Sequence, residues 1–400
     1  MTRAPPSATT AVVAGVLMLV TVMGIGRFAY TPLLPRMRDA LDWSLATAGD
    51  VASANFVGYL LGALIAGPLA ARRQRATWLA VALVSSALTT LAGGHAWPLP
   101  GWLVLRFVAG FASALGIVIG VALVIDYVIR LGKPSLATGP FPGVGIGIVL
   151  SVLVTEAVAW QGVDVFGQWA ALGLVAMACT CVALAILWRL PNRVPAEPLP
   201  GHVATRLAAT PALRRLIASY GLLGLGYVVT ATFLVAMARK LPQAALIEPL
   251  CWIVVGATAA PSVPLVRRLA ARYGNMAVMR GAFLLQATGV LLAGWQVGVV
   301  AILLGGACLG ATFLSITALV LNAARAEAGA HAELAIGWMT ASFGFGQLLG
   351  PFIAGRLAQA SGGFGAPSAM AAVALVLGAL LLPRPPATAG PRGAMENAGA

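Results

Sequence analysis

Long apolar runs, separated by short polar segments, most constrain how this chain can fold. A helix of roughly 20 apolar residues crosses the hydrocarbon core of a bilayer. Lipid offers no hydrogen-bond partner to an open backbone, so each run is expected to be helical. The runs predict twelve spans, over residues 9–36, 47–70, 77–94, 102–128, 137–159, 166–188, 213–237, 246–264, 276–295, 298–322, 333–357 and 364–383.

The composition favours a membrane protein, since 60% of the 400 residues are hydrophobic and 9% are charged. A soluble domain of this size could not cover so much apolar surface. The net charge of +14 would also fit a protein that binds nucleic acid. However, Lys and Arg form short clusters between the apolar runs, as in the cytoplasmic loops of membrane proteins. We therefore expect an all-α polytopic membrane protein with no nucleic acid partner.

The placement of Lys and Arg predicts an orientation. If the N-terminus is inside, eighteen of the 25 basic residues lie on the inner side and five on the outer side; Arg27 and Arg106 lie within spans. Basic residues are enriched in cytoplasmic loops. We therefore expect both termini on the cytoplasmic side of a bacterial-type inner membrane.

One connection is longer than the others and contains Pro191, Pro195, Pro198 and Pro200; it separates six spans from six. The segment after the last span is rich in Pro, Gly and Ala and has little to bury. We expect an N-terminal six-helix bundle, a cytoplasmic linker, a C-terminal six-helix bundle and a disordered cytoplasmic tail, over residues 1–188, 189–212, 213–383 and 384–400.

The two halves show an internal repeat. A shift of 200 positions matches Gly24 with Gly224, Gly26 with Gly226, Leu69–Arg72 with Leu269–Arg272, and Gly110 with Gly310. One ungapped shift thus serves three separate regions of the chain. This pattern is typical of two bundles related by an axis along the membrane normal.

An arginine lies inside the first apolar run, within the stretch Gly24–Pro35 (GIGRFAYTPLLP). Arginine deep in a span costs about 3 kcal/mol on insertion scales, so Arg27 is expected to face protein or a wet cavity. The two glycines before it allow close helix packing, and the two prolines after it remove backbone donors. These features indicate a helix that moves. Alternatively, Arg27 snorkels to the headgroups.

Several motifs carry a resemblance to a known family. Gly67–Arg75 (GPLAARRQR) resembles the G-x-L-a-D-R-x-G-R signature of the major facilitator superfamily, with Ala71 at the acidic position and Gln74 at the second glycine. The run Leu269–Gly274 is a second copy, and Arg106–Gly110 is similar to the R-x-x-x-G element of the fourth helix.

The stretch Gly24–Pro35, together with Gly143–Gly147 and Gly346–Pro351, resembles more specifically the YbfB/YjiJ branch of this superfamily. The resemblance implies that spans 1, 4, 7 and 10 line a central cavity. Polar residues on these spans are the candidates for substrate binding, namely Arg27, Tyr30, Arg106, Tyr227, Thr230 and Ser315. Each Ser or Thr could instead bond to a backbone carbonyl one turn earlier.

The resemblance also implies a gating loop, with Arg72 and Arg73 in the first copy and Arg272 in the second. The glycine-rich runs in spans 5 and 11 are interpreted as packing surfaces. Because Arg27 and Arg106 outnumber the acids on the cavity-lining spans, we expect an anionic or polar organic solute.

Two intramembrane acids, Glu156 and Glu248, are the candidates for proton coupling, because a carboxylate in low dielectric can titrate near neutral pH. Glu248 could instead be an acid at a helix start. We predict that Glu156 pairs with Arg106, because the two residues lie 24 and 26 positions from the intervening turn and so differ in depth by about 3 Å. Asp126 is expected to pair with Arg130 or with the Arg72 loop.

The favoured function is secondary active transport of a small organic solute by alternating access, coupled to protons. Alternatives are a broad-specificity drug or metabolite exporter and a non-transporting membrane sensor on the same fold. An enzyme is not expected, since the three histidines are isolated and there is no phosphate-binding loop. We expect no cofactor or metal, and a monomer whose partners are the solute, the proton and the bilayer.

Overall fold

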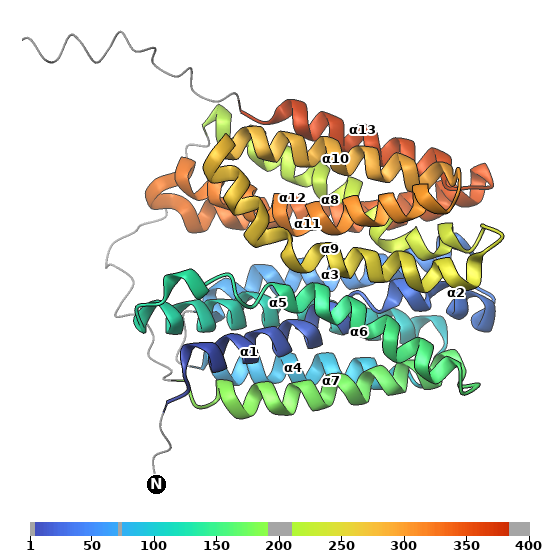
Figure 1. Cartoon of the computed structure of the whole chain (residues 1–400), viewed down its shortest axis with the longest axis horizontal. Coiled ribbons are helices and arrows are strands. Elements are labelled where there is room, and N and C mark those ends of the chain that lie inside the picture. The colour runs from blue at the N-terminus through green and yellow to red at the C-terminus, as the bar shows by residue number, and fades with distance from the viewer. Residues whose placement is uncertain (1–4, 71–73, 191–209, 384–400) are drawn as a thin grey trace, which may run out of the picture.

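The structure is a computed structural model that describes residues 5–70, 74–190 and 210–383. This part of the chain is built from helices, arranged in two bundles (Figure 1). The predicted tail, 384–400, and almost all of the predicted linker, 189–212, lie outside the described residues, so the domain bounds stay a prediction.

The N-terminal bundle begins with α1 (Ala8–Leu19), the π-helical segment η1 (Val20–Ile25) and α2 (Tyr30–Leu41), which together form the first span. The bundle continues with α3 (Leu45–Ala70), α4 (Arg75–Ala92), α5 (Leu99–Arg130), the short 3-10 helix η2 (Pro134–Leu136), α6 (Pro142–Ala159) and α7 (Val165–Leu187).

The C-terminal bundle consists of α8 (Pro211–Ala238), α9 (Ala244–Tyr273), α10 (Asn275–Trp295), α11 (Val299–Ala328), the 3-10 helix η3 (Gly329–His331), α12 (Ala332–Ser361) and α13 (Gly365–Leu381). In Figure 1 it lies above the N-terminal bundle, and the long axes of the helices run roughly from left to right.

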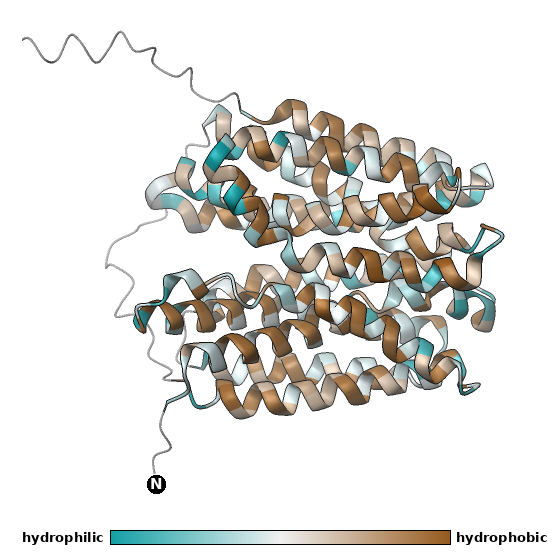
Figure 2. Cartoon of the chain, in the orientation of Figure 1, coloured by the Kyte–Doolittle hydropathy of each residue, from teal (hydrophilic) through white to brown (hydrophobic). Residues whose placement is uncertain are grey.

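Each of the twelve predicted spans corresponds to one helical stretch, so the predicted all-α membrane fold is confirmed. Within the described ranges, ten stretches are long and apolar enough to cross a membrane, and α12 and α13 complete the second bundle. Figure 2 shows apolar residues along the middle of the helices and polar residues toward their ends.

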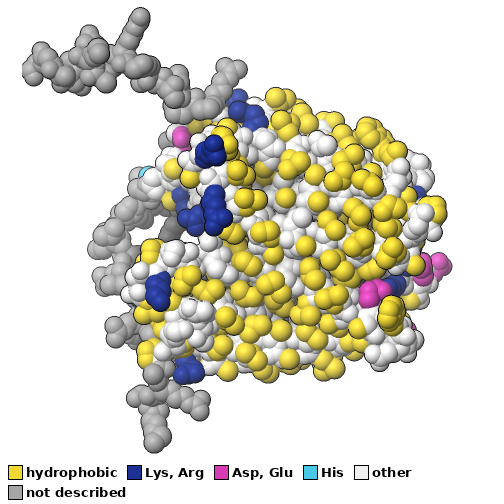
Figure 3. Space-filling model, viewed as in Figure 1, with side chains coloured by type: hydrophobic (Ala, Val, Ile, Leu, Met, Phe, Trp, Pro, Cys, Tyr) yellow, Lys and Arg dark blue, Asp and Glu magenta, His cyan; other side chains and the backbone are white. Residues whose placement is uncertain are grey.

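The two ends of the bundles differ in charge. We call the end at which α1 begins and α13 finishes the terminal end, at left in Figure 1, and the opposite end the far end. On the face in Figure 3, Lys and Arg side chains gather toward the terminal end, and an apolar band covers the middle. This distribution is the one that the sequence predicts for a cytoplasmic terminal end.

Local sequence signals set several helix ends. Ser7, Asp164 and Thr210 precede α1, α7 and α8, and each side chain accepts a hydrogen bond of 2.8–3.1 Å from the backbone N–H three residues later. These caps satisfy donors that the first helical turn leaves free. At the other end, α9 and α12 stop at Gly274 and Gly362, whose positive φ angles of 85° and 69° suit glycine.

The first span is broken near its middle. In and just after η1, the N–H groups of Gly26 and Phe28 bond to carbonyls five residues earlier, at 2.8 and 3.0 Å. Pro32 has no N–H to donate to the Phe28 carbonyl, which instead accepts from Thr31 at 3.3 Å. The backbone therefore leaves regular α-helical geometry over the stretch that contains Arg27, and such irregular segments are frequent at functional sites.

Glycines allow the first span to pack closely, as predicted. A Cβ added to Gly24 would lie 2.4 Å from the Cα of Gly147 on α6. In the second half, a Cβ added to Gly224 would lie 2.3 Å from the Phe343 carbonyl and 3.2 Å from the nitrogen of Gln347 on α12. Positions 24 and 147 correspond to 224 and 347 after a shift of 200, so the repeat relates these contacts in space.

A second pair of contacts follows the same shift. A Cβ added to Gly110 would lie 1.9 Å from the Asn55 carbonyl, and one added to Gly310 would lie 2.2 Å from the Val255 carbonyl. These glycines bring α5 against α3 and α11 against α9. The internal repeat predicted from the sequence is therefore also a repeat of helix packing.

Contacts between positions related by the shift locate the axis between the bundles. The Thr31 hydroxyl donates to the Ala231 carbonyl at 2.6 Å, and Arg239 donates to the carboxylate of Asp39. In a two-fold arrangement, equivalent positions meet only near the symmetry axis. The axis that relates the two bundles therefore passes close to α2 and to the C-terminal half of α8. These contacts lie in the half of the molecule nearer the far end.

Candidate functional site

A small cavity lies between the bundles. Its volume is about 10 Å³, which is room for about one water molecule. It is lined from both bundles by Phe28, Ile148, Tyr227, Ala231, Trp252, Val255, Leu309 and Phe313. A solute larger than water can enter only if some of these side chains move.

Four of the eight residues that line this central cavity are aromatic. Phe28 meets Trp252 and Phe313 edge to face, with ring centroids 6.5 and 5.7 Å apart. Tyr227 stacks against Phe313 at 5.9 Å and against Phe343 at 5.7 Å. Because these rings come from both bundles, a planar ligand between them would contact both halves of the protein.

Arg27 lies beside this aromatic wall and is 4% exposed. Its guanidinium carbon is 3.8 Å from the ring centroid of Tyr59, 4.9 Å from that of Phe56 and 5.6 Å from that of Phe28. The three rings form a cation–π cage. The alternative that Arg27 snorkels to the headgroups does not hold, because the side chain is buried.

The Nε and Nη2 atoms of Arg27 are buried and have no hydrogen-bond partner among the described residues. These two atoms share one edge of the guanidinium, which can bind a carboxylate through two parallel N–H···O bonds. A buried arginine edge without an acceptor is costly for a folded protein, so this edge is a candidate ligand site.

Arg106 has a different environment, although it is equally buried. Its Nη1 and Nη2 atoms donate to the backbone carbonyls of Gly26 and Arg27 at 3.1 and 3.0 Å. The guanidinium also lies 4.9 Å from the ring centroid of Tyr30. Arg106 thus satisfies carbonyls at the break in the first span and holds the backbone that carries Arg27.

The other predicted substrate-binding residues are placed as follows. The Tyr30 hydroxyl donates to the Ala48 carbonyl at 2.9 Å. Tyr227 lines the central cavity, and its hydroxyl accepts a hydrogen bond from Gln347. Thr230 is buried, and its hydroxyl has no partner among the described residues. Ser315 lines a separate groove on the side of the C-terminal bundle and donates to the Ala311 carbonyl one turn earlier, at 2.9 Å.

The predicted ion pair between Arg106 and Glu156 is wrong. Glu156 accepts a hydrogen bond from Arg36 at 2.5 Å, and the same guanidinium donates to Gln168 at 2.8 Å. The first span packs between α5 and α6, so Arg106 meets that span and Glu156 meets α2 and α7. Arg106 and Glu156 were expected at equal depth, but the first span lies between their two helices.

Glu248 is 8% exposed and accepts a hydrogen bond from Nε of Arg239 at 2.8 Å. The same arginine pairs with Asp39 of the other bundle. A second ion pair between the bundles joins Arg356 to Asp50 at 2.7 Å. All five side chains lie toward the far end, where they join the two bundles.

The gating candidates are only partly within the described residues. Arg72 and Arg73 lie outside them, and Arg272 is exposed, with its guanidinium 5.2 Å from the ring centroid of Tyr273. Asp126 accepts a hydrogen bond at 2.8 Å from Arg75, which is the last residue of the predicted signature and the first residue of α4. Across the described part of the chain, no group of three or more His, Cys, Asp or Glu side chains could hold a metal ion.

Four aromatic residues at Arg27 and Phe28 were not predicted from the sequence. Phe56 and Tyr59 of α3 contact Arg27, and Trp252 of α9 and Phe313 of α11 contact Phe28. Single aromatic residues in apolar spans are common, so the sequence carries no signal that sets these four apart. Tyr227 was predicted, and Phe28 directly follows Arg27 in the chain.

Comparison with curated proteins finds partial similarity to transporters. The 4-hydroxybenzoate transporter PcaK of Pseudomonas aeruginosa is 29% identical over 153 residues, which are 38% of this chain and 33% of the relative. The niacin transporter NiaP of Acinetobacter baylyi is 32% identical over 162 residues, which are 34% of this chain and 37% of the relative. The similarity thus spans about a third of each relative's length.

Solved structures share the fold. The xylose transporter XylE from E. coli, in an inward open conformation, matches with a TM-score of 0.71 and 14% identity, over 96% of this chain and 97% of that chain. A mutant of the nucleoside transporter NupG matches with a TM-score of 0.70 and 16% identity, over 93% of this chain and 98% of that one. At these identities, the likeness concerns the fold alone.

A family model described as "Uncharacterised MFS-type transporter YbfB" matches residues 19–383, which confirms the resemblance seen in the motifs. The match begins at the last residue of α1, and it covers the break in the first span with Arg27, all residues of the central cavity and the rest of both bundles. Its members are transporters, so the prediction that the protein is not an enzyme is confirmed as well. The chain belongs to the YbfB-type family of major facilitator superfamily transporters.

Proposed function

We propose that this transporter moves a small organic anion that carries a carboxylate next to a planar ring. The observation that carries the proposal is the unpartnered Nε and Nη2 edge of Arg27, which lies in a cage of aromatic rings. The edge would bind the carboxylate, and the rings of Phe28, Tyr227 and Phe313 would hold the planar part. The relatives named for 4-hydroxybenzoate and niacin support this class, since both compounds are aromatic carboxylic acids.

Binding to the purified protein tests this class. Benzoate and nicotinate should stabilise the full chain against thermal unfolding, because both ligands bind the folded state. Benzamide has the same ring without the charge and should give no stabilisation at equal concentration. If benzamide and quaternary ammonium compounds bind as well as benzoate, the proposal fails in favour of a broad-specificity exporter.

Transport by alternating access would use the ion pairs at the far end. Arg239–Asp39 and Arg356–Asp50 join the bundles there, which supports a state whose far end is closed. The solute would then reach Arg27 from the terminal end. A cysteine placed at Ala231, in a chain free of its native cysteines, should react with a membrane-impermeant reagent from the far side only after both pairs are removed. Equal labelling with the pairs intact would contradict this role.

Proton coupling, in this proposal, acts at Glu248. This residue shares Arg239 with Asp39 of the other bundle, so protonation of its carboxylate would alter a link between the bundles. Glu156 remains a second candidate, but its partners Arg36 and Gln168 belong to its own bundle. A coupling group is expected to bias the equilibrium between two arrangements of the bundles, and this favours Glu248.

The protein would lie in a bacterial-type inner membrane with its terminal end in the cytoplasm. The support is the excess of Lys and Arg at that end, seen in the sequence and in Figure 3. Reporter fusions at Ala400 test this orientation, and a periplasmic location would refute it.

The alternative of a non-transporting sensor predicts a different result in proteoliposomes. Such a protein would show no flux of any carboxylate.

A further inference from the structure

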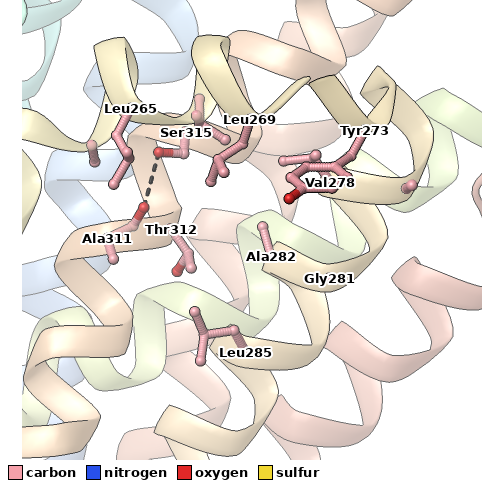
Figure 4. A pocket seen from close by; sticks show the side chains of 13 residues that line it. Leu265, Leu269, Tyr273, Val278, Gly281, Ala282, Leu285, Ala311, Thr312 and Ser315 are labelled. Carbon is pink, nitrogen blue, oxygen red and sulfur yellow. Dashed lines mark hydrogen bonds between the residues drawn. The ribbon is translucent and has the colours of Figure 1, made fainter. Parts of the chain in front are cut away.

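A groove on the side of the C-terminal bundle has no role in the proposed transport cycle. It lies between α9 and α10, with α11 as its floor, and its volume is about 430 Å³ (Figure 4). This is within the range of roughly 300–1,000 Å³ that is usual for ligand sites. Leu265 and Leu269 of α9 and Leu285 of α10 line it and are 40–53% exposed, so in a membrane the groove opens toward lipid.

The floor of the groove favours hydrocarbon over a polar solute. Two hydroxyls lie there, those of Thr312 and Ser315. The Thr312 hydroxyl is bonded to the Cys308 carbonyl at 2.6 Å and to Gln286, and the Ser315 hydroxyl donates to the Ala311 carbonyl at 2.9 Å (Figure 4). Both hydroxyls are therefore engaged within the protein. Ser262 in the α9 wall donates to the Ala259 carbonyl at 2.8 Å, and apart from Tyr273 the other lining residues are apolar.

The end of the groove nearest the terminal end is strongly basic. Arg267, Arg268 and Arg272 are exposed near the end of α9, and the Arg272 guanidinium lies 5.2 Å from the ring centroid of Tyr273, which lines the groove. Arg280 of α10 faces another side, where it donates to the carbonyls of Ala379 and Leu382.

No acidic residue follows Glu248 in α9, and α10 contains none. Between Glu248 and Glu327 the sequence contains five arginines and neither Asp nor Glu. Basic clusters beside membrane helices attract anionic lipid headgroups, and basic pockets between helices bind them. The apolar groove and the arginines at its end thus match the two parts of one ligand, a hydrocarbon chain and an anionic headgroup.

We propose that this groove is a binding site for an anionic phospholipid. One acyl chain lies between Leu269 and Gly281, and the headgroup phosphate binds Arg272 and Arg268. This assigns Arg272, a gating candidate on the sequence alone, to lipid binding. The site requires insertion in a membrane and is independent of the solute that the central cavity takes.

Photocrosslinking tests the site in the full chain. The protein is reconstituted in phosphatidylcholine vesicles with a minor fraction of phosphatidylglycerol that carries a diazirine in one acyl chain, and the adducts are mapped by mass spectrometry. Adducts should concentrate on the α9 and α10 segments around Leu265 and Leu285. Unlabelled phosphatidylglycerol should compete better than added phosphatidylcholine. Adducts spread evenly over the lipid-facing helices would overturn the proposal.

Matched variants distinguish binding of the acyl chain in the groove from binding of the headgroup by the arginines. A Cβ added to Gly281 meets nothing within 4 Å, so Gly281→Leu should fill the groove without a clash and remove the adducts. Gly337→Leu is the control, because an added Cβ at that helical glycine of α12 also meets nothing within 4 Å. Arg268→Gln with Arg272→Gln should keep the groove adducts and lose the preference for phosphatidylglycerol. Unchanged adducts in Gly281→Leu, or an unchanged preference in the double variant, would contradict the assignment.

Discussion

Replacing Arg27 and Arg106 one at a time by methionine should separate ligand binding from fold stability. Both arginines are 4% exposed and lie within the N-terminal bundle, but their hydrogen bonds differ. Nε and Nη2 of Arg27 have no partner among the described residues, whereas Arg106 lacks a partner only at Nε and donates through Nη1 and Nη2 to the carbonyls of Gly26 and Arg27. Methionine is unbranched and apolar, so it can remain against the aromatic rings without donating a hydrogen bond.

The loss of binding can be estimated from the free edge of Arg27. Each hydrogen bond from a charged donor contributes about 1.5–3 kcal/mol, so two such bonds to a carboxylate contribute about 3–6 kcal/mol. Since about 1.4 kcal/mol corresponds to a tenfold change in affinity, Arg27→Met should weaken benzoate binding by on the order of 10²–10⁴-fold. Isothermal titration of the purified protein measures the two Kd values.

The effect on stability should have the opposite order. Arg27→Met loses cation–π contacts of about 0.5–2 kcal/mol and is relieved of a buried charge that no acid balances. Arg106→Met leaves two buried carbonyls without donors, at a cost of about 1–3 kcal/mol each. Thermal unfolding without ligand should therefore show a clearly lower Tm for Arg106→Met and a smaller change for Arg27→Met.

Similar behaviour of the two variants would contradict the separate roles of Arg27 and Arg106. Benzoate affinity within about threefold of the wild type in Arg27→Met would mean that the free edge is not the carboxylate site, because even one charge-assisted bond is worth about tenfold. A larger loss of Tm in Arg27→Met than in Arg106→Met would mean that Arg27 is structural.

Two further variant pairs test the packing and the coupling. Gly24→Val should prevent recovery of folded protein in size-exclusion chromatography, because an added Cβ would lie 2.4 Å from the backbone of the neighbouring helix. Gly337→Val is the control and should be recovered like the wild type, because a Cβ added there meets nothing within 4 Å. Equal recovery of the two variants would contradict a packing role for Gly24. Glu248→Gln should abolish proton-driven accumulation of solute but keep exchange, while Glu156→Gln should keep both; the reverse result would move the coupling site to Glu156.

The helices and their repetition in the two bundles could largely be predicted from the sequence. Hydropathy locates the spans because lipid exposure imposes a run of apolar residues. The 200-residue shift located equivalent packing, as the contacts of Gly110 and Gly310 show, because glycine matters where two backbones meet. Arg27 could be found for a similar reason, since a charge within an apolar run needs an explanation in the fold.

Partners across the bundle could not be predicted. The depth of Arg106 and Glu156 follows from residue counts along two helices, but the direction of each side chain depends on which helix packs beside it. The first span lies between α5 and α6, so Glu156 meets Arg36 instead. The direction of Ser315 could not be predicted either, because it lines the groove between α9 and α10 and not the central cavity.

Solute exchange in proteoliposomes is the most direct test of whether the protein transports aromatic carboxylates through a site at Arg27. Vesicles that contain the full chain are loaded with unlabelled solute and diluted into radiolabelled benzoate, so that exchange needs a carrier but no ion gradient. A carboxylate site at Arg27 predicts rapid, saturable uptake of label with benzoate or nicotinate inside, none with benzamide inside, and none by Arg27→Met. Uptake that is equally fast with benzamide inside, or that persists in Arg27→Met, would contradict the assignment of a carboxylate site at Arg27.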